Sequence, residues 1–320
     1  MLKKIYKEIK KFDKIFIFGH VRPDGDCYGS QFGLKALIED NFPEKEVHVV
    51  GDISEFVSFL GTPEKAQIKD EDIEGNLAIV VDCGAPDRVS DQRYKLGKKI
   101  IKIDHHIATG EYGDLVYVEE EKPACCQILV EFALINKMKI TERAAFPLYF
   151  GLVTDTGRFR FRGVDAHTFK AAGVLVDAGV DIEKIDNLLS VEDLNVIHFK
   201  GYIYESAIFS PNGVVYAKIT EDVVKQYGLS FEDAAAQISL LGTIRDYPLY
   251  FLFIEYPTGI RIRLRSRGPR VDKLANMYGG GGHEKAAGGN LDLWNDLDEF
   301  INKADALIKY YKETGKDDLY

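Results

Sequence analysis

The sequence has few cysteines and no long apolar segment. Its four cysteines, Cys27, Cys83, Cys125 and Cys126, form neither a CxxC pair nor a zinc-ribbon spacing. No segment approaches the roughly 20 apolar residues that a transmembrane helix needs, and the amino terminus has no apolar run of signal-peptide length. These absences argue against a disulfide scaffold and a membrane protein. They predict a cytoplasmic protein with reduced thiols and no membrane partner.

Positive charge is also in short supply. The chain has 41 lysines and arginines against 51 aspartates and glutamates, a formal net charge of −10. This excess of acid argues against a protein that holds long duplex nucleic acid through phosphate neutralisation alone. It leaves open an enzyme that acts on small anions, because bound cations reverse the local field.

The remaining composition is that of an ordinary globular protein. Hydrophobic residues make up 46% and charged residues 29% of the 320 positions. A chain of this length can bury a large core without cross-links, and it has room for about two domains.

Groups that bind hard metal ions gather after the first apolar run. Residues 15–18 have the pattern of a buried strand, and His20, Asp24 and Asp26 follow it on a loop before a helical pattern that starts at 29–30. A Pro-Asp-Gly turn also needs aspartate for its own geometry, so the loop alone leaves both interpretations open.

Two further apolar strands end in the same kind of residue. Residues 77–81 run into Asp82, and residues 99–103 run into Asp104-His105-His106. Asp155 follows an apolar helical pattern over 144–153, and a charged, aromatic strand is expected after it. Strands that alternate with helices predict an α/β fold with a doubly wound parallel sheet. Ligands bind at the carboxyl edge of such a sheet, where these residues would meet.

The residue types favour one class of metal chemistry. Carboxylates mixed with imidazoles suit Mn²⁺, Mg²⁺ or Fe²⁺ better than a thiolate zinc site, so Cys27 and Cys83 are expected to be packing residues. Five acids are too many for one tetrahedral zinc ion. They suit two ions about 3.5–4 Å apart that share a bridging carboxylate, an arrangement that supports in-line phosphoryl displacement.

The second half of the chain predicts a site for an anion. Residues 250–256 and 259–265 are expected to form a hairpin. A helical segment covers 271–277, and a glycine run over 279–282 precedes His283. Glycines let backbone amides approach an anion, and a helix beginning near His283 would add a favourable field. The residues expected to contact substrate are Arg265, Arg267, Gly280, Gly281, Gly282 and His283. Arg261 and Arg263 are expected on a solvated face.

These patterns divide the chain into three parts. A catalytic α/β domain is expected over 1–186 and a smaller α/β substrate-binding domain over 209–320. A long helical pattern over 184–208 predicts a helical linker, placed at 187–208. A metal cleft that faced a phosphate-binding domain would suit a short substrate.

The sequence resembles a known group. His20-x3-Asp24-x-Asp26, Asp82, Asp104-His105-His106 and Asp155 resemble the four motifs of the DHH phosphoesterase superfamily. The glycine run with His283, followed by Ala-Ala-Gly-Gly289, resembles the C-terminal domain associated with it. The order and length of these parts are similar to the stand-alone nano-RNase A type.

The resemblance implies a role for each residue of the site. Two divalent ions are expected, Mn²⁺ first and Mg²⁺ second, with Asp82 bridging them. One ion would be held by His20, Asp24 and Asp82, the other by Asp26, Asp82, His105 and Asp155. Asp104 would orient His105, and His106 would lie beside the scissile phosphate. Spacing alone does not decide which of the paired histidines binds metal.

The function implied is a Mn²⁺-dependent phosphodiesterase that cuts short single-stranded RNA and linear dinucleotides, such as pApA and pGpG, into mononucleotides. 3′-Phosphoadenosine 5′-phosphate is a second nucleotide substrate to consider. Two alternatives stay open: a cyclic di-AMP phosphodiesterase and a catalytically silent nucleotide-binding protein. The oligomeric state, monomer or homodimer, is open as well.

Asp26 gives the first test of this interpretation. Replacing it by alanine should abolish Mn²⁺-dependent hydrolysis without unfolding the domain, since the carboxylate is assigned to one metal ion. Turnover of a labelled dinucleotide, measured together with circular dichroism, checks both parts, and retained turnover would contradict the assignment.

Overall fold

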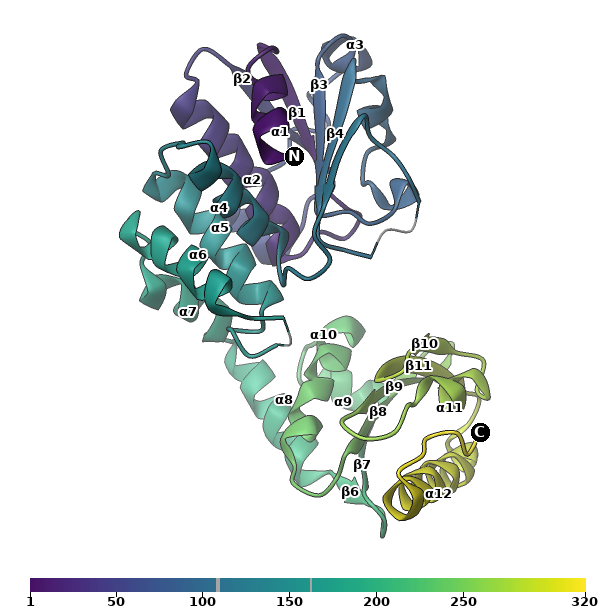
Figure 1. Ribbon diagram of the computed structural model, residues 1–320. Coiled ribbons are helices and arrows are strands. Elements are labelled where there is room, and N and C mark those ends of the chain that lie inside the picture. Colours follow the sequence, from purple (N-terminus) through teal and green to yellow (C-terminus); the bar gives the residue numbers. More distant parts are fainter. Residues whose placement is uncertain (108–109, 162) are drawn as a thin grey trace. The chain divides into compact units, whose positions relative to one another are not determined.

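A five-stranded parallel sheet forms the centre of the first of two units, Met1–Leu189, in the computed structural model of the chain (Figure 1). The structure describes all residues except 108, 109 and 162. The strands occur in the order β2-β1-β3-β4-β5, and every neighbouring pair is parallel. Their bounds are β1 Lys14–Phe18, β2 Glu46–Val50, β3 Leu77–Val81, β4 Lys99–Asp104 and β5 Leu115–Val118. The predicted α/β class with a parallel sheet is confirmed.

Alternate residues of these strands enter two cores. Ile15 and Ile17 of β1 belong to the larger core, whereas Phe16 and Phe18 belong to the smaller one on the other face. Because side chains of a strand point alternately to its two faces, both faces are covered and β3 is buried along its whole length.

Long helices build the larger core, and short ones cover the other face. The helices of this unit are α1 Leu2–Ile9, α2 Gly25–Asn41, α3 Asp70–Ile73, α4 Cys125–Ile135, α5 Glu142–Asp155, α6 Ala166–Asp177 and α7 Ile182–Ser190. Three 3₁₀ helices, η1 Glu55–Leu60, η2 Pro86–Arg88 and η3 Gln92–Leu96, complete it. Figure 1 shows α2, α4 and α5 together on one side of the sheet. No helix in the described part of the chain is both long and apolar enough to cross a bilayer.

The close packing of α2 against α5 depends on glycine. A Cβ atom at Gly29 would lie 2.5 Å from the carbonyl oxygen of Pro147, and one at Gly25 would lie 2.3 Å from the hydroxyl of Thr154. Backbone atoms cannot move aside as a flexible side chain can, so Gly29 sets how near the two helices come. This approach brings the start of α2, with Asp26, to the end of α5, with Asp155.

The second unit, Ser190–Tyr320, contains a mixed six-stranded sheet in the order β10-β11-β9-β8-β7-β6. Its strands are β6 Ile208–Phe209, β7 Val214–Ile219, β8 Leu249–Tyr256, β9 Gly259–Ser266, β10 Gly281–His283 and β11 Ala286–Leu291. Only β7 and β8 pair in parallel among these described strands. The helices are α8 Leu194–Glu205, α9 Glu221–Gln226, α10 Phe231–Ala236, α11 Asp272–Asn276 and α12 Leu297–Thr314, with 3₁₀ helices η4 Gln237–Thr243 and η5 Trp294–Asp296. The β8–β9 hairpin occurs as predicted.

Four local expectations were wrong. Helix α2 begins at Gly25 instead of 29, because the Asp24 side chain accepts hydrogen bonds from the first turn and caps it. The stretch after Asp155 forms turns, not a strand. The pattern over 184–208 is interrupted at 191–193, between α7 and α8. His283 ends a strand, and no helix begins there.

The contact at Gly29 can be tested by substitution. Gly29→Ala should lower the free energy of unfolding by about 1–3 kcal/mol, because the added methyl group overpacks the α2–α5 contact. Gly173→Ala is the matched control: an added Cβ meets nothing within 4 Å in α6, so it should gain about 0.5–1 kcal/mol. Urea denaturation measures both, and equal effects of the two substitutions would contradict the packing argument.

Candidate metal centre

Asp24 and Asp26 are placed by the start of α2. Asp24 is the N-cap residue, and its Oδ1 accepts from the backbone N–H groups of Asp26 and Cys27, both at 3.1 Å. Its side chain is 59% exposed, which leaves the second oxygen accessible. Asp26 is the second residue of α2, within its first turn, and is buried. Two carboxylates of this loop therefore differ sharply in their access to solvent.

Asp26 also connects α2 to α4. Its Oδ2 accepts from the backbone N–H of Cys125 at 2.6 Å, and its Oδ1 accepts from that of Cys126 at 3.0 Å. These two amides belong to the first turn of α4, which lacks a side-chain cap of its own. An alanine at position 26 would remove this cap as well as the charge, so Asp26→Asn is the cleaner variant for testing catalysis.

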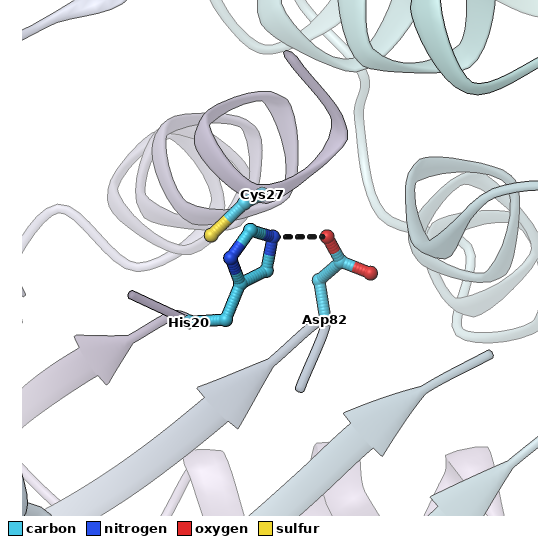
Figure 2. Close-up of side chains that lie close together, drawn as sticks. All are labelled: His20, Cys27 and Asp82. Carbon is cyan, nitrogen blue, oxygen red and sulfur yellow. Dashed lines mark ion pairs between the residues drawn. The ribbon is translucent and has the colours of Figure 1, made fainter. Parts of the chain in front are cut away.

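Asp82 lies between two histidines from neighbouring strand ends. Its Oδ2 is 3.6 Å from Nε2 of His20, and its Oδ1 is 3.3 Å from Nε2 of His105. Figure 2 shows the imidazole of His20 and the carboxylate of Asp82 facing one another. Asp82 Oδ1 is buried and has no hydrogen-bond partner within the described chain. A buried carboxylate oxygen in this position is suited to a cation.

The tautomer of His105 is fixed from outside the site. Nδ1 lies 3.0 Å from the carbonyl oxygen of Lys122, so it carries the proton and donates. The lone pair of Nε2 then faces carboxylate oxygens of Asp82 and Asp155, each at 3.3 Å, and of Asp26 at 3.7 Å. A backbone carbonyl on one nitrogen, with the other directed at acidic groups, is typical of a metal-binding histidine. His20 repeats the pattern, with Nδ1 2.8 Å from Val21 O.

Burial and mutual repulsion shape the charges of these acids. Burial, and then the charges of Asp82 and Asp155, raise the pKa of Asp26 well above its usual value. Burial and the charge of Asp82 raise the pKa of Asp155 to about 6. Although burial opposes it, the carboxylate of Asp82 and the charge of Asp26 raise the pKa of His105 to about 10. Crowded carboxylates that resist ionisation would be relieved by a divalent cation, so the donor set fits the metal that the sequence predicts.

Asp104 accepts from the backbone N–H of His105 at 2.9 Å, but the imidazole that it orients is that of His106 and not, as predicted, that of His105. Its Oδ1 accepts from Nδ1 of His106 at 2.9 Å, whereas the Nδ1 of His105 pairs with Lys122. Burial opposes ionisation of Asp104, but hydrogen bonds from His106 and the charge of Lys102 keep its pKa below the usual value. Asp104 is fully buried and thus positions His106 without reaching solvent itself. The side chain of His106 is 47% exposed and remains accessible.

Cys27 lies behind the centre. Its sulfur, His20 and Asp82 are close enough to hold an ion in principle, and Figure 2 shows the sulfur beside the imidazole nitrogen that faces away from Asp82. That nitrogen, Nδ1, already donates to Val21 O. Burial raises the pKa of the Cys27 thiol to about 12. A buried, protonated thiol on the rear of the ring is a packing group, as expected.

A cavity of about 330 Å³ adjoins the metal centre. Asp24 and Asp155 line it, together with Phe56, Arg158 and Arg160. The charged, aromatic stretch expected after Asp155 contains Arg158 and Arg160 and was expected to line a cleft, whereas no role was predicted for Phe56. Arg158 and Arg160 lie three and five residues after Asp155, so two cations close to a predicted metal ligand were a usable signal. Phe56 lies 99 residues before Asp155 and gave none.

A second cavity, of about 200 Å³, lies on the second unit. Its lining includes Arg261, Arg263 and Gly280. Arg265 and Arg267 do not line it: the Arg265 guanidinium donates to Leu264 O and that of Arg267 to Ile244 O and Tyr247 O. The cavity thus lies beside the two arginines expected to be merely solvated.

Strand register nevertheless places Arg265 and His283, two of the predicted substrate contacts, on the same face of the sheet as Arg261 and Arg263. Arg265 pairs with Ala286, which in turn pairs with His283. Residues directly opposite one another on adjacent strands share a face of the sheet. Arg261, Arg263, Arg265 and His283 therefore form one basic face, with the glycine run at its edge, although Gly281, Gly282 and His283 do not line the cavity.

Comparison with known proteins gives matches over both units. Residues 14–152 match the DHH family, N-terminal domain, and residues 212–310 match the DHHA1 domain. The chain is 34% identical over 315 residues to the bifunctional oligoribonuclease and PAP phosphatase NrnA of Bacillus subtilis, covering 98% of this chain and 100% of that protein. It is 37% identical to NrnA of Mycoplasma genitalium, covering 94% and 96%.

Two other similarities are more distant. The cyclic-di-AMP phosphodiesterase GdpP of Geobacillus thermodenitrificans is 27% identical over 88% of this chain and 45% of its own length. Among solved structures, an exopolyphosphatase-related protein from Bacteroides fragilis has a TM-score of 0.81 at 21% identity, covering 98% of this chain and 96% of that one. The latter likeness supports the fold alone.

Metal affinity should depend on pH in a defined direction. Binding must displace the proton that Asp155, with its pKa of about 6, retains in acid. We expect Mn²⁺ affinity to fall more steeply as the pH is lowered through about 6, by up to about a further tenfold per pH unit, because this proton adds to the one that His105, with a pKa of about 10, already holds. Calorimetric titration measures it. Asp155→Asn should bind more weakly and show a shallower dependence, and an unchanged slope would contradict the assignment.

Proposed function

The chain belongs to the DHH family, in the form that carries a DHHA1 domain, and from this membership we propose its reaction. It is a phosphoesterase that uses Mn²⁺ to hydrolyse short RNA oligonucleotides and linear dinucleotides to mononucleotides. 3′-Phosphoadenosine 5′-phosphate is its second substrate. The full-length similarity to NrnA proteins, named as oligoribonucleases and PAP phosphatases, supports both activities. A cytoplasmic location belongs to the same proposal.

The observation that carries the proposal is the position of Asp82. Its two carboxylate oxygens face the free nitrogens of two separate imidazoles, as a carboxylate shared by two ions would. We assign one ion to His20, Asp24 and Asp82, and the other to Asp26, Asp82, His105 and Asp155. When bound, such a pair supplies Lewis-acid stabilisation of phosphate oxygens and a nucleophile at neutral pH.

His106 has the geometry of a proton donor. Its Nδ1 donates to Oδ1 of Asp104 at a distance of 2.9 Å, so Nε2 is the nitrogen left for the substrate. The hydrogen bond to Asp104 raises the pKa of His106 above its usual value, which favours the imidazolium form. A half-exposed imidazolium fixed in orientation can stabilise the charged phosphate and donate a proton to the departing oxygen. Asp104 acts through His106 as a positioning residue.

The basic face of the second unit suits a phosphate group. Arg261 and Arg263 line the second cavity, together with Gly280 and Gly288. We propose that this face binds a terminal phosphate, with Arg265, His283 and the adjoining Gly281 and Gly282 at its edge. Arg267 supports the face through its bonds to backbone carbonyls.

Cyclic di-AMP is the second candidate substrate. The similarity to a cyclic-di-AMP phosphodiesterase over 88% of this chain favours it. A catalytically silent binding protein is disfavoured, because every expected ligand position holds a side chain able to ligate and the structure brings them together.

A panel of substrates tests the proposal. With Mn²⁺, the protein should hydrolyse labelled di- to pentanucleotides and 3′-phosphoadenosine 5′-phosphate, and should act less on cyclic di-AMP. Products separated by chromatography give the rates, with Mg²⁺ run in parallel.

The matched inactive variant is Asp82→Asn. Asp82 has a φ of +54°, and asparagine tolerates this left-handed backbone better than alanine does. The variant should retain its fold by circular dichroism and lose at least about a hundredfold in rate, since the shared carboxylate is removed. Cleavage of cyclic di-AMP alone would shift the assignment to the second candidate. If no substrate of the panel is hydrolysed, the alternative of a catalytically silent binding protein is favoured.

A further inference from the structure

The cavity beside the metal centre contains more than the proposed metal ligands. It has a volume of about 330 Å³ and lies within the first unit, against Asp24 and Asp155. Phe56 and Arg160 contribute an aromatic ring and a guanidinium group to its lining. Neither residue has a part in holding metal or in the proton transfer assigned to His106. An aromatic ring and a cation next to a phosphoryl-transfer centre are the groups that bind a nucleotide.

Phe56 presents its ring to solvent. It belongs to η1 and is 63% exposed, so the ring is accessible to a ligand. The ring is 6.5 Å from that of Phe150 in α5, at an interplanar angle of 52°. This contact holds Phe56 against the same helix that ends in Asp155.

The turn after Asp155 is strained and firmly held. Gly157, Arg158 and Phe159 have φ values of +54°, +59° and +61°, and two of them are residues that rarely adopt this region. Arg158 fixes the turn by donating to Asp186 at 3.2 Å and to Leu189 O at 2.9 Å. Strained backbone persists only where its surroundings determine it, and it clusters at functional sites.

Arg160 is oriented by this turn. Its Nε donates to Gly157 O at 2.9 Å, so the guanidinium is directed by the strained segment. The side chain is exposed, and across the described ranges it makes no ion pair with a carboxylate. Its two terminal nitrogens are therefore available as a fork for phosphate oxygens. Arg158, in contrast, is engaged by its own contacts.

We propose that this cavity is a nucleotide subsite of the catalytic unit itself. Arg160 contacts the phosphate group of the nucleotide adjoining the scissile bond, and Phe56 stacks on its base. The inference rests on the proposed nucleotide chemistry and adds to it a specificity: the substrate must carry a base on this side. Because every base has a π-face, the subsite accepts all four bases and gives little sequence preference.

Direct binding tests the subsite apart from catalysis. The probe is an RNA dinucleotide whose phosphodiester is replaced by a non-hydrolysable methylene phosphonate, titrated into Mn²⁺-loaded protein by calorimetry. Phe56→Leu should weaken binding by about tenfold, the loss expected when a stacked base is released, and Phe56→Trp should restore it. Phe59→Leu is the matched control, since Phe59 shares η1 and the contact with Phe150 but does not line the cavity.

The charge is tested in parallel. Arg160→Ala should weaken binding by about tenfold and Arg160→Lys by less, because lysine keeps the charge without the fork. Lys184→Ala removes a cation from a different cavity and should have no effect. In steady-state hydrolysis, Phe56→Leu and Arg160→Ala should mainly raise KM. An abasic version of the probe should bind wild-type protein weakly and show no further loss in Phe56→Leu.

The outcomes separate this inference from the proposed function. Unchanged probe affinity in Phe56→Leu and Arg160→Ala, with normal hydrolysis by the wild type, overturns the subsite and leaves the function intact. Weakened affinity in these variants, but not in Phe59→Leu or Lys184→Ala, supports the subsite even if the wild type hydrolyses no oligonucleotide. Calorimetric Mn²⁺ affinity must stay unchanged in both variants; a loss there would assign the residues to the metal centre and overturn the subsite.

Discussion

The fold of the first unit must hold three carboxylates close to one another. Asp26, Asp82 and Asp155 lie within 3.3–3.7 Å of one imidazole nitrogen of His105, partly out of water. Such a cluster opposes folding unless protons or cations compensate it. The scaffold offsets this cost with backbone contacts: carbonyl groups fix both imidazoles, and the first turn of α4 donates two hydrogen bonds to Asp26. The packing of α2 on α5 then sets the distance between the groups.

Much of the centre could be predicted from the sequence for a topological reason. Parallel strands end at one edge of their sheet, so His20, Asp82 and the 104–106 triplet had to converge once three apolar strands were recognised. Asp155 was found in the same way, as an acid at the end of an apolar element. Helix starts were less accurate, because a cap such as Asp24 is also a good turn residue.

What could not be predicted depends on contacts between distant segments. The partner of Asp104 was misassigned because His105 and His106 are adjacent in the sequence and their spacing to the other motifs does not separate them. The contact that distinguishes them is made by Lys122 O, in the segment that follows β5. The glycine run of the second unit was expected to precede a helix. Instead it enters a strand, since β10 pairs with β11 at the edge of a sheet that already provides the basic face. The cavity at Phe56 and Arg160 likewise joins segments about 100 residues apart.

The double use of Asp26 has a consequence for how the protein matures. Its amide partners, Cys125 and Cys126, lie 99 and 100 residues further along the chain, and Asp155 is further still. On a translating ribosome, the early acids emerge long before the residues that complete their environment. The centre therefore cannot assemble until most of the first unit has been synthesised and packed. A cation that needs all of these groups could be bound only after the first unit has folded, so a truncated nascent chain would lack a complete centre.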